Sequence, residues 1–271
     1  MTYPDLFGLT GAERERLRAT FGEAAELYHR ARPGYPAALF EDLTRLAGLT
    51  RGSRVLEIGC GTGQATVPLA RLGCTVVAVE LSPDLAAVAR HELRAFPDVR
   101  VDVGAFEEWA APEEPFDLVL AATSFHWIDP EVRVRKPADL LRPGGSLAVV
   151  ATDHVAGGTE RFFVDVQRCY ERFDPQTPPG LRPTPGAGIP DEPVEPAPAR
   201  FGPALFRRYE WEVAYTTAQY LDLLMTYSGH RAMPAPARDG LLACVAGRID
   251  GDHGGRISKR YQTRLTLVQL R

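Results

Sequence analysis

Residues 55–63 read VLEIGCGTG, an apolar run that ends in three glycines at alternate positions. The apolar run predicts a buried strand, and residues 64–72 after it have the character of a helix. At such a turn, glycine lets a ligand approach the backbone where any Cβ would collide with it. Because three glycines exceed what a bare turn requires, we expect this turn to bind a ligand.

The same alternation of strand and helix continues to residue 152. Five strands are predicted, at 54–58, 75–80, 99–103, 116–121 and 146–152. The helical stretches between them predict crossover connections, which make the strands parallel.

Two later strands, at 207–214 and 256–270, lack a parallel crossover and predict an antiparallel edge. The fold class expected is therefore α/β. It is a Rossmann-like three-layer sandwich with a mostly parallel seven-stranded sheet and an antiparallel C-terminal edge hairpin.

Helices are also predicted on both sides of the first five strands. Apolar residues at helical spacing indicate helices over 12–29, 36–47, 160–173, 218–227 and 238–248. Ser82 and Asp129, each followed by proline, are typical helix caps. Between 175 and 203 the prolines are too dense for regular structure, which predicts a lid-like insertion.

The composition argues against several classes of protein. A formal net charge of −4 provides no broad basic field for a nucleic-acid backbone. The apolar runs fall far short of the roughly 20 residues that span a bilayer, so no membrane partner is expected. The first residues lack the features of a secretory signal, and we predict a cytoplasmic protein.

The chain has four scattered cysteines, Cys60, Cys74, Cys169 and Cys244. Their spacing matches no paired motif, and no histidine stands in metal-ligand register with them, so no metal site is expected. We predict four idle thiols, which agrees with a reducing cytoplasm.

Two cofactor classes use a glycine-rich turn after the first strand of such a sheet. The dinucleotide fingerprint G-x-G-x-x-G needs its third glycine where this chain has Gln64. An acid such as Glu57 also sits badly beside a pyrophosphate, but it suits a positively charged ligand. An NAD-dependent oxidoreductase is therefore the less favoured alternative.

The pattern E-x-G-x-G-x-G, from Glu57 to Gly63, resembles the first motif of class I S-adenosylmethionine-dependent methyltransferases. The resemblance covers about residues 28–152 and is looser toward the C-terminus. It implies S-adenosylmethionine as the cofactor, with Gly59, Gly61 and Gly63 along its amino-acid end. Glu57 would orient the loop and face the cationic portion of the cofactor.

Two further segments take site roles from this resemblance. Glu80 ends the second strand, where an acid can accept hydrogen bonds from both ribose hydroxyls. Leu81 would pack on the adenine, and residues after the third strand would lie at the adenine edge. Many members carry an acid at the position of Ala105, so the backbone of Ala105 and Phe106 is expected to supply that contact.

The fourth strand leads into the run TSFHWID at 123–129, which resembles the small-molecule branch that includes trans-aconitate methyltransferase-like proteins. By this resemblance Thr123 faces the methyl group and the acceptor. His126 can serve as a general base, because an imidazole titrates near neutral pH, or it can cap the next helix or bond a loop.

The segment YHRARPGYP at 28–36 also recurs in this branch. A helix there can fold across the mouth of the cofactor site. Tyr28 and Arg32 would then reach the methionine carboxylate, although Arg32 can instead pair with a surface acid.

Together these assignments predict a single methyltransferase domain over 1–271. Its parts are N-terminal helices that cover the cofactor site (1–50), the cofactor-binding core (51–152), a helical and Pro-rich lid insertion (153–205), and C-terminal strands and helices that complete the sheet (206–271).

The function expected is transfer of a methyl group from S-adenosylmethionine to a small-molecule acceptor, by O-, N- or C-methylation. The acidic charge and the aromatic run after the fourth strand favour a partly apolar small molecule over a protein or a nucleic acid. A non-catalytic S-adenosylmethionine-binding protein stays open as the alternative, besides the oxidoreductase.

Overall fold

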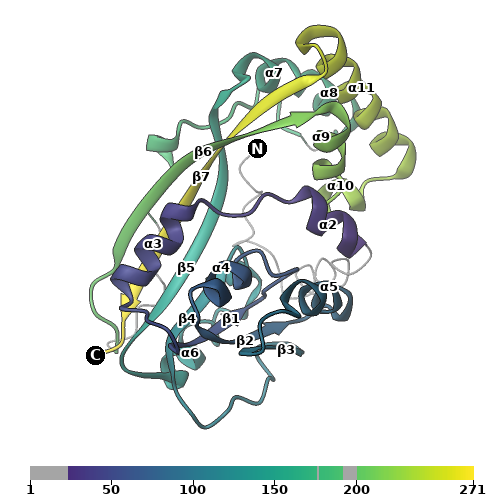
Figure 1. Ribbon diagram of the computed structural model, residues 1–271. Helices are drawn as coiled ribbons and strands as arrows, with labels where there is room; N and C mark the ends of the chain where they lie inside the picture. The colour runs from purple at the N-terminus through teal and green to yellow at the C-terminus, as the bar shows by residue number, and fades with distance from the viewer. Residues whose placement is uncertain (1–23, 176, 192–199) are drawn as a thin grey trace.

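A computed structural model describes residues 24–175, 177–191 and 200–271 (Figure 1). Its strands form one seven-stranded sheet in the order β3-β2-β1-β4-β5-β7-β6. Their bounds are β1 Arg54–Ile58, β2 Thr75–Glu80, β3 Val99–Val103, β4 Phe116–Ala122, β5 Leu141–Gly158, β6 Leu205–Thr216 and β7 Arg256–Gln269. β1 runs parallel to β2 and β4, whereas β7 runs antiparallel to β5 and β6. The predicted Rossmann-like sheet with an antiparallel C-terminal edge is confirmed.

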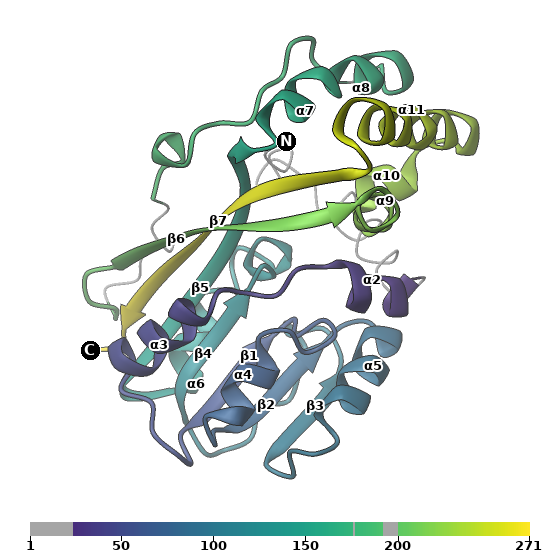
Figure 2. The same ribbon diagram turned by 45° about the horizontal axis from the view of Figure 1, so that its top comes forward.

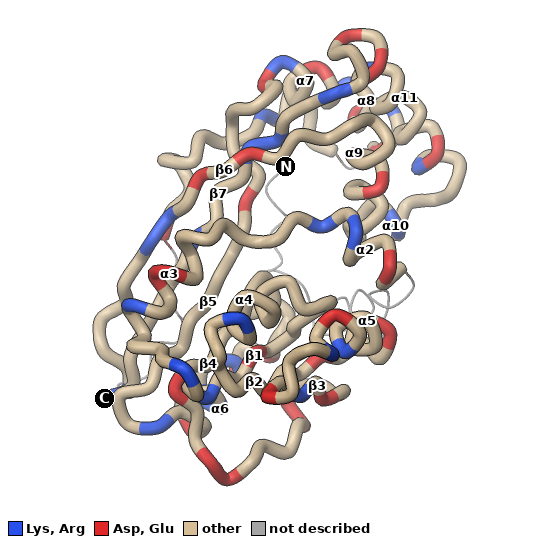
Figure 3. Tube along the Cα trace, viewed as in Figure 1, with Lys and Arg blue, Asp and Glu red and all other residues tan. Residues whose placement is uncertain are grey.

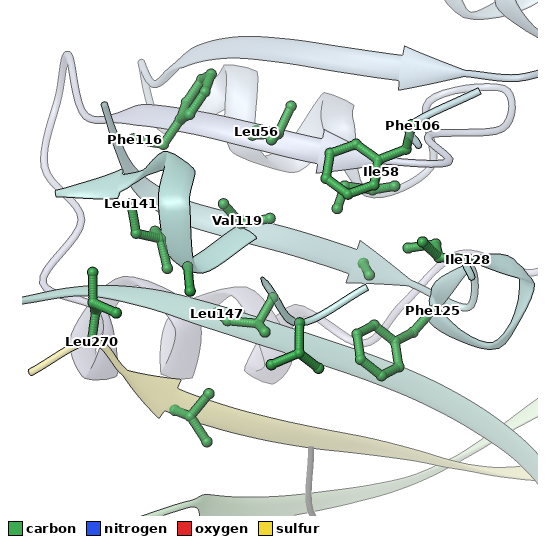
Figure 4. Packing of buried hydrophobic residues seen from close by; sticks show 14 of the residues in the cluster. Leu56, Ile58, Phe106, Phe116, Val119, Phe125, Ile128, Leu141, Leu147 and Leu270 are labelled. Carbon is green, nitrogen blue, oxygen red and sulfur yellow. The ribbon is translucent and has the colours of Figure 1, made fainter. Parts of the chain in front are cut away.

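Helices cover both faces of the parallel strands, because these strands bury apolar side chains on both sides. Val55 of β1 packs on one face with residues of α3 (Ala37–Leu46) and α4 (Thr66–Arg71), including Leu39 and Leu69. The next residue, Leu56, packs on the opposite face with Val119 and with α6 (Arg135–Leu140). Figure 4 shows this second cluster on one face of β1, β4 and β5. The alternation along β1 therefore creates the three layers.

Local signals set the ends of several helices. α5 (Pro83–Leu93) begins at Ser82, whose hydroxyl accepts a hydrogen bond from the Leu85 amide, and Pro83 is its first residue. Pro36 is the N-cap residue of α3 rather than its first helical residue. The first predicted helix is described from its last part onward, as α2 (Ala25–Ala31), and residues 12–23 lie outside the described range.

Two of the last three strands are longer than predicted. β5 has 18 residues, where 146–152 was predicted, and β6 has 12, where 207–214 was predicted. β7 has 14 residues and nearly matches its predicted range of 256–270, and β5 and β7 both extend past the parallel strands. Their far ends carry a helical cap, defined here as α7 Glu160–Asp165, α8 Gln167–Phe173, α9 Thr217–Leu224, α10 Ser228–Ala232 and α11 Ala235–His253. The predicted single helix over 160–173 is thus two helices. The cap has its own apolar core around Phe162, Leu223 and Leu241, and Figure 2 shows it apart from the parallel strands.

Ion pairs tie the long strands to one another, and a main-chain hydrogen bond ties them to the Pro-rich segment. Arg264 of β7 pairs with Asp153 of β5 at 2.9 Å, and Arg260 of β7 pairs with Glu212 of β6 at 2.6 Å. Figure 3 shows basic and acidic residues interspersed along these strands. In the Pro-rich segment, the Thr184 carbonyl accepts from the Ala156 amide at 2.9 Å. These described residues therefore contact the long strands, and their role as a lid stays a prediction.

Two of the four cysteines contradict the prediction of four thiols. Cys169 of α8 and Cys244 of α11 form a disulfide, with Cα atoms 5.8 Å apart and a sequence separation of 75. The sequence shows no paired motif because the packing of α8 on α11 brings the two together. Cys60 and Cys74 are buried free thiols, as predicted. One argument for a reducing cytoplasm is thereby removed.

Within the described ranges, no helix is both long and apolar enough to cross a bilayer.

The disulfide can be tested by thiol titration. Protein denatured without reductant is expected to expose two reactive thiols, those of Cys60 and Cys74, and reduced protein four. Replacing Cys169 and Cys244 with serine should lower the free energy of unfolding by about 4 kcal/mol, because the unfolded chain gains loop entropy. Urea denaturation of both forms measures this loss. Four reactive thiols without reductant would contradict the assignment.

Candidate active site

A pocket lies at the carboxyl ends of β1, β2 and β4, the edge where open α/β sheets bind ligands. It gathers residues that are far apart in the sequence. Nine predicted site residues line it, namely Tyr28, Arg32, Gly59, Gly61, Glu80, Leu81, Phe106, Thr123 and His126. Two further lining residues are Ser228 of α10 and Thr226 in the turn between α9 and α10; residues of the late helices were expected at the acceptor, but neither of these two was singled out from the sequence. They carry no local motif, so packing of the cap over the core is what brings them here.

The glycine-rich turn needs residues without a Cβ. Gly59, Gly61 and Gly63 have φ values of 69°, 58° and 92°, which favour glycine. A Cβ on Gly59 would lie 2.6 Å from the Cβ of Ser124, so the turn after β4 nests against the glycines. Gly59 and Gly61 line the pocket, whereas Gly63 faces Leu93 of α5. Gly63 therefore serves helix packing beneath the turn.

Glu80 anchors the turn to the end of β2. Its Oε2 accepts a hydrogen bond from the Gly61 amide at 2.9 Å, and its Oε1 accepts from the Ser82 amide at 2.9 Å. The side chain is 5% exposed and lines the pocket. A carboxylate accepts hydrogen bonds only, so at this edge of the sheet it suits a ligand with hydroxyl groups.

Glu57 lies deeper than Glu80. Its side chain is 1% exposed, and its Oε2 accepts a hydrogen bond from the Thr66 hydroxyl at 2.7 Å. Burial, and secondarily the charge of Glu80, raises the pKa of Glu57 to about 8. Glu57 is therefore largely protonated at neutral pH. Its contact orients the start of α4 beneath the turn, and its side chain is directed at Thr66.

Helix α2 covers the glycine-rich turn. The ring of Tyr28 lies 3.8 Å from the position that a Cβ on Gly61 would take, and His29 Nδ1 lies 3.2 Å from the hydroxyl of Thr62. Arg32 donates a hydrogen bond to the Thr226 carbonyl at 3.2 Å, and its guanidinium lies 4.4 Å from the ring centre of Tyr227. In Figures 1 and 2, α2 lies between the core and the cap. Arg32, at the end of α2, thus connects this covering helix with the helical cap.

The turn after β4 forms the other end of the pocket. Thr123 has a φ of 57°, and its hydroxyl lies 2.9 Å from the hydroxyl of Tyr35. His126 stands in η3 (Phe125–Trp127). Burial, and then the charge of Arg133, lowers the pKa of His126 to about 4. His126 is therefore neutral at physiological pH and is a weak base.

The loop after β3 forms a wall of the pocket through Gly104, Phe106 and Glu107. Ala105, predicted beside Phe106, holds the loop together, since its carbonyl accepts from the Trp109 amide at 2.9 Å.

Lys136 of α6 holds the loop after β3 in shape through hydrogen bonds to its main chain. Its Nζ donates to the carbonyls of Phe106, Glu107 and Trp109 at 2.7, 3.2 and 2.7 Å. An ammonium group has three N–H donors, so these carbonyls match its full capacity. Sequence reasoning missed Lys136 because no local motif connects it with a loop about thirty residues earlier.

The chemistry of this pocket fits S-adenosylmethionine. Glu80 can accept from a ribose diol, Leu81 and Phe106 offer apolar surface for adenine, and Arg32 can pair with a carboxylate. A carboxylate, an apolar wall and a guanidinium group therefore occur together in one pocket.

Comparison with known proteins agrees with this reading. Residues 55–145 match the family model described as a methyltransferase domain. The chain is 36% identical over 137 residues to an uncharacterised methyltransferase of Mycobacterium tuberculosis, an alignment that covers 51% of this chain and 54% of that protein. It is 43% identical over 100 residues to the ubiquinone biosynthesis O-methyltransferase of Xanthomonas campestris, which covers 35% and 41% of the two chains. The chain spans about half the length of these relatives.

Solved structures share the fold over most of the chain. A candidate type II methyltransferase of Anaeromyxobacter dehalogenans superposes with a TM-score of 0.62 at 26% identity, over 87% of this chain and 97% of that one. The YcgJ protein of Bacillus subtilis has the same fold, with a TM-score of 0.50 at 17% identity over 87% and 99% of the two chains. Residues 55–145 carry the sequence pattern of the matched methyltransferase-domain family, and the chain around them shares the fold of these solved structures.

Lys136 gives a test of whether the loop after β3 shapes the pocket. Lys136→Met should weaken binding of S-adenosylhomocysteine about tenfold, because three carbonyls lose a charged donor and the loop relaxes. Arg135→Met, which alters the exposed neighbour on α6, is the matched control and should bind normally. Isothermal calorimetry measures both. Equal affinity of the Lys136 variant and the unaltered protein would show that the loop keeps its shape without the lysine.

Proposed function

We propose that this protein is an enzyme that transfers the methyl group of S-adenosylmethionine to a small-molecule acceptor. The observation that carries the proposal is the pocket at the strand ends, where Glu80 is held by the Gly61 and Ser82 amides beside the glycine-rich turn. The dinucleotide alternative loses support, because the family match is to a methyltransferase domain.

In the proposed complex, each end of the cofactor meets a different wall. Glu80 accepts from the ribose hydroxyls, and Leu81 and Phe106 enclose the adenine. Tyr28 and Arg32, both on the cover helix or at its end, hold the methionine end. Glu57 keeps the turn in shape through Thr66 rather than by contact with the ligand.

The bound cofactor supplies a methyl group on a sulfonium, which is already a good leaving group. The protein therefore needs to align the acceptor with that methyl group and to exclude water. Helix α2 and the cap residues Thr226 and Ser228 close the pocket on one side, and the turn that begins at Thr123 closes it on the other. A base is required only when the acceptor must lose a proton.

The acceptor we propose is small and partly apolar. Trp127 and Ile128 line the pocket beside His126, and Thr226 and Ser228 add hydroxyl groups. The name of the Xanthomonas relative describes methylation in ubiquinone biosynthesis, which supports a small-molecule acceptor here. The FHW run further supports membership of the trans-aconitate methyltransferase-like branch.

A ligand-binding assay followed by a transfer assay tests the function. Saturating S-adenosylhomocysteine should raise the thermal midpoint, since 100 times its Kd stabilises a native state by about 2.7 kcal/mol. NAD should leave the midpoint unchanged. Glu80→Gln should weaken binding of S-adenosylhomocysteine about tenfold, because an amide nitrogen cannot accept.

For transfer, labelled S-adenosylmethionine is incubated with the protein and a cell extract, and label should enter the small-molecule fraction. Binding without any transfer would favour the non-catalytic alternative. Label confined to bulk protein or RNA would refute a small-molecule acceptor.

The role of His126 is tested by the pH dependence of transfer. With a pKa of about 4, the ring stays neutral from pH 5 to 8, so the rate should show no imidazole step near pH 6.5. His126→Asn should keep the same pH profile, because the side chain then acts by contact and not by proton transfer. A step near pH 6.5 that disappears in this variant would identify His126 as a general base.

A further inference from the structure

The backbone at Thr123 is unusual. Among the residues that the structure describes, Thr123 is the non-glycine residue with a positive φ, at 57°. A β-branched side chain adopts this conformation rarely, because its Cβ crowds the backbone. Such conformations persist where neighbouring contacts impose them, and they concentrate at functional sites. Thr123 lines the pocket directly after β4.

Contacts on both sides hold the backbone of this turn. The Thr123 amide donates to the Val150 carbonyl at 2.7 Å, and the Ser124 hydroxyl donates to the Ile58 carbonyl. Ser124 also packs against Gly59 so closely that a Cβ there would collide. The turn is therefore fastened to β5 and to the glycine-rich turn.

Tyr35 holds the side chain of Thr123. Its hydroxyl lies 2.9 Å from the Thr123 hydroxyl, and its ring makes an edge contact with Phe40 of α3, with centroids 6.4 Å apart. Tyr35 stands behind Thr123 and outside the pocket lining. Burial raises the pKa of Tyr35, so it stays a neutral phenol that can donate.

The position of Tyr35 in the chain connects it to the cover of the pocket. It follows Arg32, Pro33 and Gly34 in the short link between α2 and α3. The two prolines that flank Gly34 and Tyr35 restrict φ in this link. The segment that places Tyr28 and Arg32 in the pocket lining therefore also places the Tyr35 hydroxyl beside Thr123.

We propose that Tyr35 is a positioning residue that fixes the Thr123 side chain where the pocket receives the transferable methyl group. This inference rests on the proposed methyltransferase function and adds to it a residue outside the pocket lining. It implies that loss of the Tyr35 hydroxyl disturbs the methyl position and spares the adenosyl and carboxylate contacts.

The test compares two ligands that differ by the methyl group, so it needs no acceptor. Calorimetry measures Kd for S-adenosylmethionine and for S-adenosylhomocysteine with Tyr35→Phe, Thr123→Val and the double variant. Each single variant should raise the Kd for S-adenosylmethionine at least threefold and should leave the Kd for S-adenosylhomocysteine within twofold of its value in the unaltered protein. The double variant should equal the single variants, because both remove the same hydrogen bond.

Tyr209→Phe is the matched control. The Tyr209 hydroxyl donates to Asp42 of α3 at 2.7 Å and stands outside the pocket lining. Its loss also removes one tyrosine hydrogen bond, but the ratio of the two dissociation constants should not change. Hydrogen exchange of the ligand-free protein adds a second reading, in which amides of 121–128 exchange faster in Tyr35→Phe than in Tyr209→Phe.

An unchanged ratio in Tyr35→Phe overturns the inference, as do additive effects in the double variant. Unaltered protein that binds neither S-adenosylmethionine nor S-adenosylhomocysteine overturns the proposed function itself. The two failures are therefore distinct.

Discussion

The hydrogen bonds of Glu80 are the contacts on which the pocket depends. One carboxylate oxygen accepts a hydrogen bond from the Gly61 amide, in a turn whose glycines have positive φ values. The other oxygen accepts a hydrogen bond from the Ser82 amide at the start of α5. A charged acceptor strengthens both bonds, and this offsets the entropy lost when a glycine-rich turn becomes ordered. Because Glu80 also lines the pocket, the carboxylate that orders the turn is also part of the pocket wall.

The rest of the site is assembled around this turn by two bodies with separate cores. The parallel strands supply the glycine turn, Glu80 and the turn at Thr123, whereas β5, β6 and β7 extend outward and carry the helical cap. Helix α2 lies between them, and Arg32 contacts the cap through Thr226 and Tyr227. The pocket is therefore formed where α2, the helical cap and the core meet.

Much of the core could be predicted from the sequence because buried parallel strands leave unbroken apolar runs. The bounds of β1, β2 and β3 agree with the predicted ranges, and Ser82 caps α5 as its position before Pro83 suggests. The predictions were weaker where strands leave the buried core. β5 continues well beyond residue 152, and the helix over 160–173 is broken at Val166, since contacts of the cap decide these bounds.

The sequence by itself determined the parts of the site that need a particular residue type at a particular place. A left-handed turn requires glycine at Gly59 and Gly61, and an acid at the end of β2 can reach that turn, so local spacing predicts both. Tertiary structure alone decided which distant side chains meet. Tyr35 bonds Thr123 across 88 residues, and Cys169 joins Cys244 across 75. Such pairs depend on how helices pack against the sheet, and packing imposes no periodicity on the sequence that could reveal them.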